Sequence, residues 1–126
     1  MNFSEAIRAV LNKYATFEGR ARRAEYWYFA LLSCVLSIVG QIIGAAGRDG
    51  GLITLLLLGA ISLVSLALIV PGIAVSVRRL HDTGRSGWFL LLALIPIVGS
   101  ILLLVWMCSR GTEGPNRFGA DPIPAV

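Results

Sequence analysis

The chain has 126 residues, enough for one domain, and 56% of them are hydrophobic while only 14% are charged. Ordinary soluble domains carry about 25% charged residues, so this composition, with a mean hydropathy of +0.79, excludes a typical soluble protein and indicates a membrane protein. The net charge of +4 comes from arginines that flank apolar runs, a pattern that favours an anionic lipid surface as partner and not nucleic acid.

The N-terminal residues 2–14 predict a short amphipathic helix. Its apolar residues fall along one stripe at helical spacing, at Phe3, Ile7, Val10, Leu11 and Tyr14. Asn2 is suited to cap the start of this helix, with Glu5 three residues later. Two placements are open: an interfacial helix in the headgroup layer, or a helix packed on the rest of the protein.

Residues 26–46 form an uncharged segment that is long enough to span a hydrocarbon core of about 30 Å. Arginines and an acid, Glu25, precede it, and an acid at the membrane edge needs a cationic partner. The candidates are Arg22, one turn back, and Arg78 and Arg79 farther along the chain. Small residues form a stripe on this segment, at Ser33, Ser37, Gly40 and Gly44. Such a stripe favours close helix packing, either within the chain or between subunits.

A short turn at residues 47–51 joins this segment to a second one at 52–77, so the two are expected to be antiparallel neighbours. The second segment is 26 residues long and contains Pro71 six residues before its end. Proline removes one backbone hydrogen bond and clashes with the carbonyl of Ala67, so we expect a kink or a wide turn there.

A polar island follows, with Arg78, Arg79, His81, Asp82 and Arg85 inside eight residues. If the helix continues past residue 77, the residues at 83 and 84, Thr and Gly, are its expected stop. A carboxylate near a helix C-terminus opposes the helix dipole, so we expect an arginine to hold Asp82. Ser86 is suited to cap the next helix.

The third apolar segment covers residues 88–108 and contains Pro96 and Gly99 near its middle. We expect a kinked helix that crosses the membrane. The alternative is a re-entrant hairpin, which requires the broken backbone to be buried in protein because lipid cannot satisfy freed polar groups. The remaining residues, 109–126, predict an irregular tail that is loosest at 123–126. The expected fold is therefore all-α, with three transmembrane helices and an N-terminal interfacial helix in a single membrane domain.

The distribution of basic residues predicts the topology. Five precede the first span, one lies in the first loop, three in the second loop and two in the tail. With three crossings, the positive-inside rule places the N-terminus and the loop at 78–87 in the cytoplasm and the tail in the periplasm.

Three strings of this chain together resemble a known family. They are FEGRARRAEYW at 17–27, RRLHDTGRSGW at 78–88 and GTEGPNRFGADP at 111–122. They look like hallmarks of the bacterial inner-membrane family called domain of unknown function 805 (DUF805), the YhaH-like proteins. The resemblance covers nearly the whole chain. It implies a multi-pass protein of the bacterial inner membrane, brings no established activity, and gives weight to the tail.

The main functional hypothesis is a non-catalytic membrane module that binds anionic lipid headgroups or a protein partner. Arginine forks match phosphate geometry, and the candidate binding residues are Arg20, Arg22, Arg23, Arg78, Arg79, His81, Asp82 and Arg85. Glu25 and Asp82 are the candidates for structural ion pairs.

Two other function classes compete with this hypothesis. A small transporter or channel needs several copies of the chain, because three spans are too few to enclose a pathway. An enzyme acting on a lipid phosphate would use His81 as general base and Asp82 to orient it, although adjacent helical residues point about 100° apart. With one histidine and two cysteines in apolar runs, Cys34 and Cys108, we expect no metal site and no cofactor. A homo-oligomer or a membrane-protein partner is compatible with each class.

Overall fold

The computed structural model describes residues 2–123, and within them the chain is helical, without a β-strand beyond one isolated bridge between Asn116 and Gly119. The expected looseness at 123–126 lies almost wholly outside the described residues. In chain order the elements are α1 Phe3–Asn12, α2 Arg23–Ala46, α3 Leu52–Ala67, α4 Ile69–Asp82, the 3-10 helix η1 Gly87–Leu94 and α5 Val98–Cys108.

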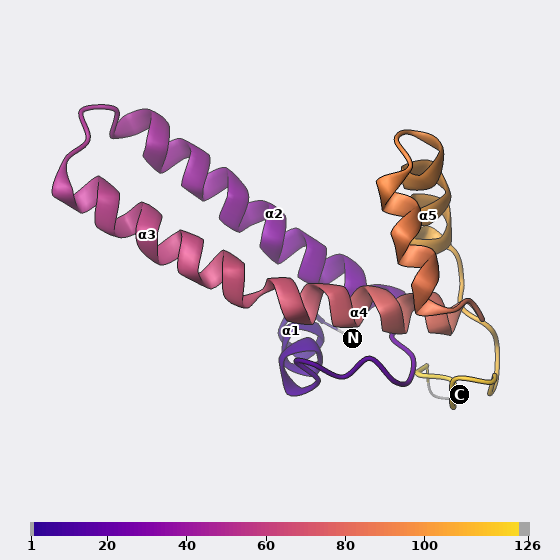
Figure 1. Cartoon of the computed structure of the whole chain (residues 1–126). Coiled ribbons are helices and arrows are strands. Elements are labelled where there is room, and N and C mark those ends of the chain that lie inside the picture. The colour runs from indigo at the N-terminus through magenta and orange to yellow at the C-terminus, as the bar shows by residue number, and fades with distance from the viewer. Residues whose placement is uncertain (1, 124–126) are drawn as a thin grey trace.

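Two long helices dominate the molecule (Figure 1). Helix α2 runs antiparallel to α3, and α3 continues into α4. By length and apolar composition, Arg23–Ala46 and the continuous Leu52–Asp82 are each able to cross a membrane. Large apolar side chains such as Ile53 and Leu63 are 75% and 70% exposed, which water would oppose and lipid favours. Part of the small-residue stripe faces α3, because a Cβ on Gly40 would lie 3.6 Å from Cγ2 of Ile61.

The long helix has the expected break at Pro71. Helix α3 ends at Ala67, and Leu68 separates it from α4. The proline ring at position 71 would clash with the carbonyl of Ala67 if the helix continued without a break. Helix α4 then continues through the polar island to Asp82. It ends at Thr83 and Gly84, and Gly84 has a φ of +77° that favours glycine.

Helix α1 begins as expected, because Oδ1 of Asn2 accepts a hydrogen bond from the amide of Glu5 at 2.8 Å. One face of α1 buries Ala6 and Val10, and Val10 packs with Phe29 and Val75 in one of the two small cores. Phe3 and Leu11 on α1 stay exposed. Helix α1 therefore packs on the rest of the protein along one face, and its placement in a headgroup layer stays a prediction.

The third apolar segment is not a crossing helix, so that prediction is wrong. Residues 87–94 form η1, the chain reverses at Pro96 and Ile97, and α5 returns beside η1 (Figure 1). The ring centroids of Phe89, near the start of η1, and Trp106, near the end of α5, are 5.6 Å apart. The segment forms a hairpin, as the alternative interpretation expects, but the burial of the break that this interpretation requires is not observed, because Ile95 and Ile97 are 50% and 74% exposed. The reversal is local, since Pro96 has no amide hydrogen to continue a helix and Ile97 adopts a φ of +68°.

The reversal changes the expected side of the tail. Leu103 and Met107 of α5 pack against Leu80 of α4, so α5 ends beside the end of α4. The tail begins there, and the amide of Thr112 donates to the carbonyl of Asp82 at 2.7 Å. The predicted placement of the tail on the opposite face from the N-terminus and the 78–87 loop is therefore wrong. All three segments lie at one end of the helix pair.

Closure of the hairpin depends on the absence of a side chain at Gly99. A methyl group at this position is therefore expected to destabilise the hairpin. A Cβ at Gly99 would lie 1.7 Å from the carbonyl oxygen of Leu92. We expect Gly99→Ala to lower the free energy of unfolding in detergent by about 1–3 kcal/mol, the usual cost of overpacking. Unfolding followed by tryptophan fluorescence measures this effect. Gly59→Ala is the control, because a Cβ at Gly59 of α3 meets no atom within 4 Å; equal stability of both variants would contradict the prediction.

Candidate functional site

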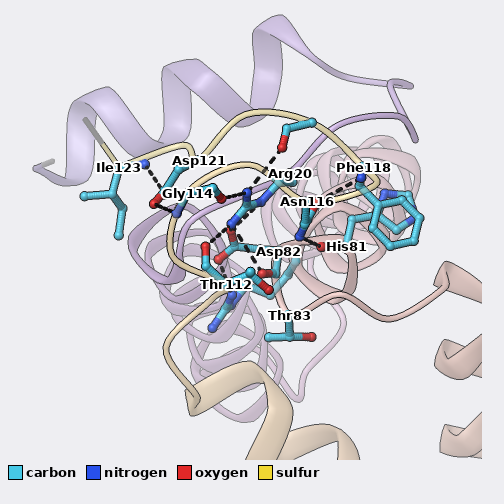
Figure 2. Close-up of polar contacts among 12 residues, drawn as sticks. Arg20, His81, Asp82, Thr83, Thr112, Gly114, Asn116, Phe118, Asp121 and Ile123 are labelled. Carbon is cyan, nitrogen blue, oxygen red and sulfur yellow. Dashed lines mark hydrogen bonds and ion pairs between the residues drawn. The ribbon is translucent and has the colours of Figure 1, made fainter. Parts of the chain in front are cut away.

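The side chain of Asp82 lies at the centre of a buried ion cluster (Figure 2). Asp82 is 1% exposed, and its Oδ1 accepts a hydrogen bond from Nε of Arg20 at 3.0 Å and lies 2.9 Å from Nη2. Its Oδ2 accepts from Nη1 of Arg79 at 2.7 Å. Arg79 and Asp82 share one face of α4 because they are three residues apart. Arg20 comes from the segment before α2, so the arginine expected beside Asp82 is present, with a second one.

Arg20 also holds the tail in place. Its guanidinium donates to the carbonyl of Thr112, to that of Gly114 at 2.7 Å and to that of Gly119 at 3.3 Å (Figure 2). At Gly111 the tail backbone passes so close that a Cβ would lie 1.9 Å from Oδ2 of Asp82. The tail is irregular as predicted, but these contacts give it a defined path over the cluster.

The C-terminal end of α5 is capped by side chains from α2 and α4. Nε of Arg79 donates to the carbonyl of Met107 at 3.3 Å, and its Nη2 donates to the carbonyl of Ser109. Nη1 of Arg23 donates to the carbonyl of Cys108 at 3.1 Å. The last carbonyls of a helix lack partners within the helix, and cations there also suit the helix dipole. The arginines thus stabilise the returning end of the hairpin.

Glu25 has its ion-pair partner in Arg78. Nη1 of Arg78 lies 3.3 Å from Oε2 of Glu25, and both side chains are buried. The amide of Ala21 donates to the carbonyl of Arg78 at 3.0 Å, which joins the segment before α2 to α4. Within residues 2–123, Nε and Nη2 of Arg78 have no hydrogen-bond partner.

His81 and Asp82 do not act on each other. Nδ1 of His81 lies 2.9 Å from the carbonyl oxygen of Gly19, and because a carbonyl only accepts, we assign the proton to Nδ1. The ring of Phe118 stacks on the imidazole with centroids 4.0 Å apart (Figure 2). Asn116 donates to the carbonyl of His81 at 2.9 Å. Asp82 therefore does not orient His81 as the enzyme hypothesis expected.

The eight candidate residues fall into two groups. Four are buried and hold the protein together, namely Arg20, Arg78, Arg79 and Asp82. The other four are at least partly exposed, namely Arg22, Arg23, His81 and Arg85. The guanidinium of Arg85 lies 4.4 Å from the ring of Trp106, in cation–π geometry. The structure thus brings together the charged ends of the first two long helices, as expected, but it turns the central arginines inward.

The tail contributes to the site in a way that no individual residue of the sequence predicts. Asn116 and Phe118 cover His81, and the carboxylate of Asp121 accepts from the amides of Gly114 and Ile123 at 3.0 Å each. These two amides lower the pKa of Asp121 below its ordinary value. The only signal in the sequence was the string at 111–122, which has weight through the family resemblance and not through any local pattern.

The buried cluster predicts a large effect of neutralising Asp82. Asp82→Asn leaves Arg20 and Arg79 buried without their shared counter-charge, which typically costs about 3–5 kcal/mol. We expect a marked loss of thermal stability in detergent, measured by circular dichroism. Asp49→Asn is the matched control, because Asp49 is exposed in the loop at the other end of α2. Similar stability of the two variants would show that the cluster is not needed for folding.

Comparison with known proteins agrees with the resemblance. The family model described as "Protein of unknown function (DUF805)" matches residues 14–120. The chain is 43% identical over 119 residues to Inner membrane protein YhaH of Escherichia coli (strain K12), and the match covers 90% of this chain and 92% of that protein. It is 46% identical over 114 residues to Inner membrane protein YhaI of the same strain, with the same coverage. It is 27% identical over 136 residues to Uncharacterized protein YiiR of the same strain, and this match covers 84% of this chain and 85% of that protein.

No solved structure matches the chain. The family model covers most of the chain, and two similar relatives are inner membrane proteins. This chain therefore belongs to the DUF805 family, a family of membrane proteins of unknown function.

Proposed function

We propose that this protein is a non-catalytic module of the bacterial inner membrane whose basic end faces the cytoplasm and contacts anionic lipid headgroups. The observation that carries the proposal is the distribution of charge. Ten of the eleven lysines and arginines belong to segments that meet at one end of the long helices, and within residues 2–123 only Arg48 lies at the other end. A strong basic bias toward one membrane face is typical of the cytoplasmic side.

The headgroup contact falls on the outer cations of this end and not on the central arginines. Arg20, Arg78 and Arg79 are at most 5% exposed and are directed to carboxylates and carbonyls of the chain itself. The exposed cations at this end are Arg8, Lys13, Arg23, Arg110 and Arg117. Each basic residue near an anionic membrane surface contributes about 1 kcal/mol of attraction.

Support for a non-catalytic role comes from the partners of the polar island. Asp82 is engaged by two arginines and His81 by a carbonyl and an aromatic ring. An oligomeric transporter has less support, because the charged residues of both long helices lie at their ends. Charged groups inside the membrane are the usual marks of an ion pathway.

The proposed topology predicts which engineered cysteines a membrane-impermeant maleimide reaches in intact cells. In a variant with Cys34 and Cys108 replaced by serine, we expect Asp49→Cys to react from outside. Glu18→Cys and Glu113→Cys should react only after the cells are opened, because the tail lies on the same side as the N-terminal segment. All three positions are exposed. Reaction of Glu113→Cys in intact cells would contradict the shared side of the tail and N-terminus.

The proposed headgroup contact predicts a preference for anionic lipid that depends on the outer cations. The protein is reconstituted with equal amounts of phosphatidylglycerol and phosphatidylcholine, and the lipids retained in mild detergent are counted by native mass spectrometry. We expect the triple variant Arg8→Gln, Lys13→Gln, Arg110→Gln to lower the preference for phosphatidylglycerol about a hundredfold, since each of the three cations contributes about 1 kcal/mol. Arg48→Gln, at the other end, should leave it unchanged. An unchanged preference in the triple variant would refute the proposal.

A further inference from the structure

An open groove of about 860 Å³ runs along α2 beside the end of α5. Arg23 lies at one end of it, followed by Trp27 and Tyr28, and Leu31 and Cys34 line it farther along α2. Cys108, the last residue of α5, also lines it. Because the lining residues of α2 recur three or four positions apart, they form one continuous face of that helix.

The groove changes from polar to apolar along its length. Arg23 is a cation, the two aromatic residues suit a membrane interface, and Leu31 is apolar and 51% exposed. From residue 23 to residue 34 the helix rises about 16 Å. That rise is close to the hydrocarbon thickness of one leaflet, about half of 30 Å. The groove thus has the length and the polarity gradient of a single phospholipid in the leaflet nearest the basic end.

The exposure and the hydrogen bonding of Arg23 distinguish it from the buried arginines. Its Nη1 donates to the carbonyl of Cys108 at 3.1 Å, and within the described residues the rest of its guanidinium makes no other hydrogen bond. The side chain is exposed and is held at the mouth of the groove by this bond. Its remaining N–H groups are available to a phosphate, which guanidinium groups bind in a forked geometry.

We infer that this groove binds one anionic phospholipid of the leaflet at the basic end, with its phosphate on Arg23 and an acyl chain along Leu31 and Cys34. This inference rests on the proposed function and names one specific site for it. The hairpin contributes to the site at its polar end, where Cys108 of α5 lines the groove and its carbonyl accepts a hydrogen bond from Arg23.

Photocrosslinking with a labelled lipid tests the site directly. The full-length protein is placed in nanodiscs that contain either phosphatidylglycerol or phosphatidylcholine with a diazirine in the acyl chain. The labelled peptides are mapped by mass spectrometry. We expect phosphatidylglycerol to label Leu31 and Cys34 at least about fivefold more than Leu56 and Leu63, which are exposed on α3. Phosphatidylcholine should not show this excess.

Substitution of Arg23 is the decisive comparison. Arg23→Gln should reduce groove labelling by phosphatidylglycerol to the level seen with phosphatidylcholine. Arg48→Gln, an exposed cation at the other end of the long helices, should leave groove labelling unchanged. Cys34→Trp, which fills the groove without touching Arg23, should also abolish the excess. Unfolding temperatures of the variants confirm that each is folded.

Several outcomes would overturn the inference. Equal labelling of the groove and of α3, or an excess that survives Arg23→Gln, would show that no specific lipid binds there. A disulfide between the Cys34 residues of two copies, formed in the nanodisc under oxidation in place of groove labelling, would show that a second copy covers the groove. If the retained lipid still favours phosphatidylglycerol, only the groove site fails; if that preference is also absent, the proposed function fails as well.

Discussion

The carboxylate of Asp82, held between Arg20 and Arg79, is the interaction on which the rest of the structure depends. Taking ions out of water costs several kcal/mol for each of them unless their partners are well placed. Asp82 is 1% exposed and Arg79 is fully buried, so their partners must be well placed. The ion pairs of Asp82 bring together the segment before α2 and the end of α4.

The buried cluster has more positive than negative charge, and backbone carbonyls accept the guanidinium hydrogen bonds that the carboxylates do not. Arg20, Arg78 and Arg79 face two carboxylates, those of Glu25 and Asp82. The additional acceptors are carbonyls at the end of α5 and in the tail, at residues 107, 109, 112, 114 and 119. Hydrogen bonds to charged groups are stronger than those between neutral groups. This explains why an irregular tail follows a defined path and why the hairpin returns to the charged end.

The arginines of this chain therefore have two roles that composition alone cannot separate. The inner ones join segments of the protein, and the outer ones remain available to the membrane surface. Arg23 is at the boundary between the two groups, because it caps α5 with one N–H group and keeps the others free within the described residues. The residue at the end of this hairpin, Cys108, also lines the groove on α2.

The sequence by itself determined the features that depend on local chemistry. Asn2 predicted the start of α1, Pro71 the break after Ala67, and Gly84 the end of α4, because each acts through its own backbone or nearest neighbours. Burial of an acid at a membrane edge was also enough to predict that Glu25 pairs with an arginine, although Arg78 was one of three candidates.

The path of the chain after residue 88 was decided only by tertiary structure. Pro96 and Gly99 are compatible with a kinked crossing helix and with a hairpin, and counting positive charges assumed the crossing. The choice depends on contacts between distant residues. Carbonyls at the end of α5 accept hydrogen bonds from Arg79 and Arg23, and a carbonyl of the tail accepts one from Arg20. Such pairings leave no periodicity in the sequence, because they join segments up to 99 positions apart. They place the tail beside the N-terminal segment.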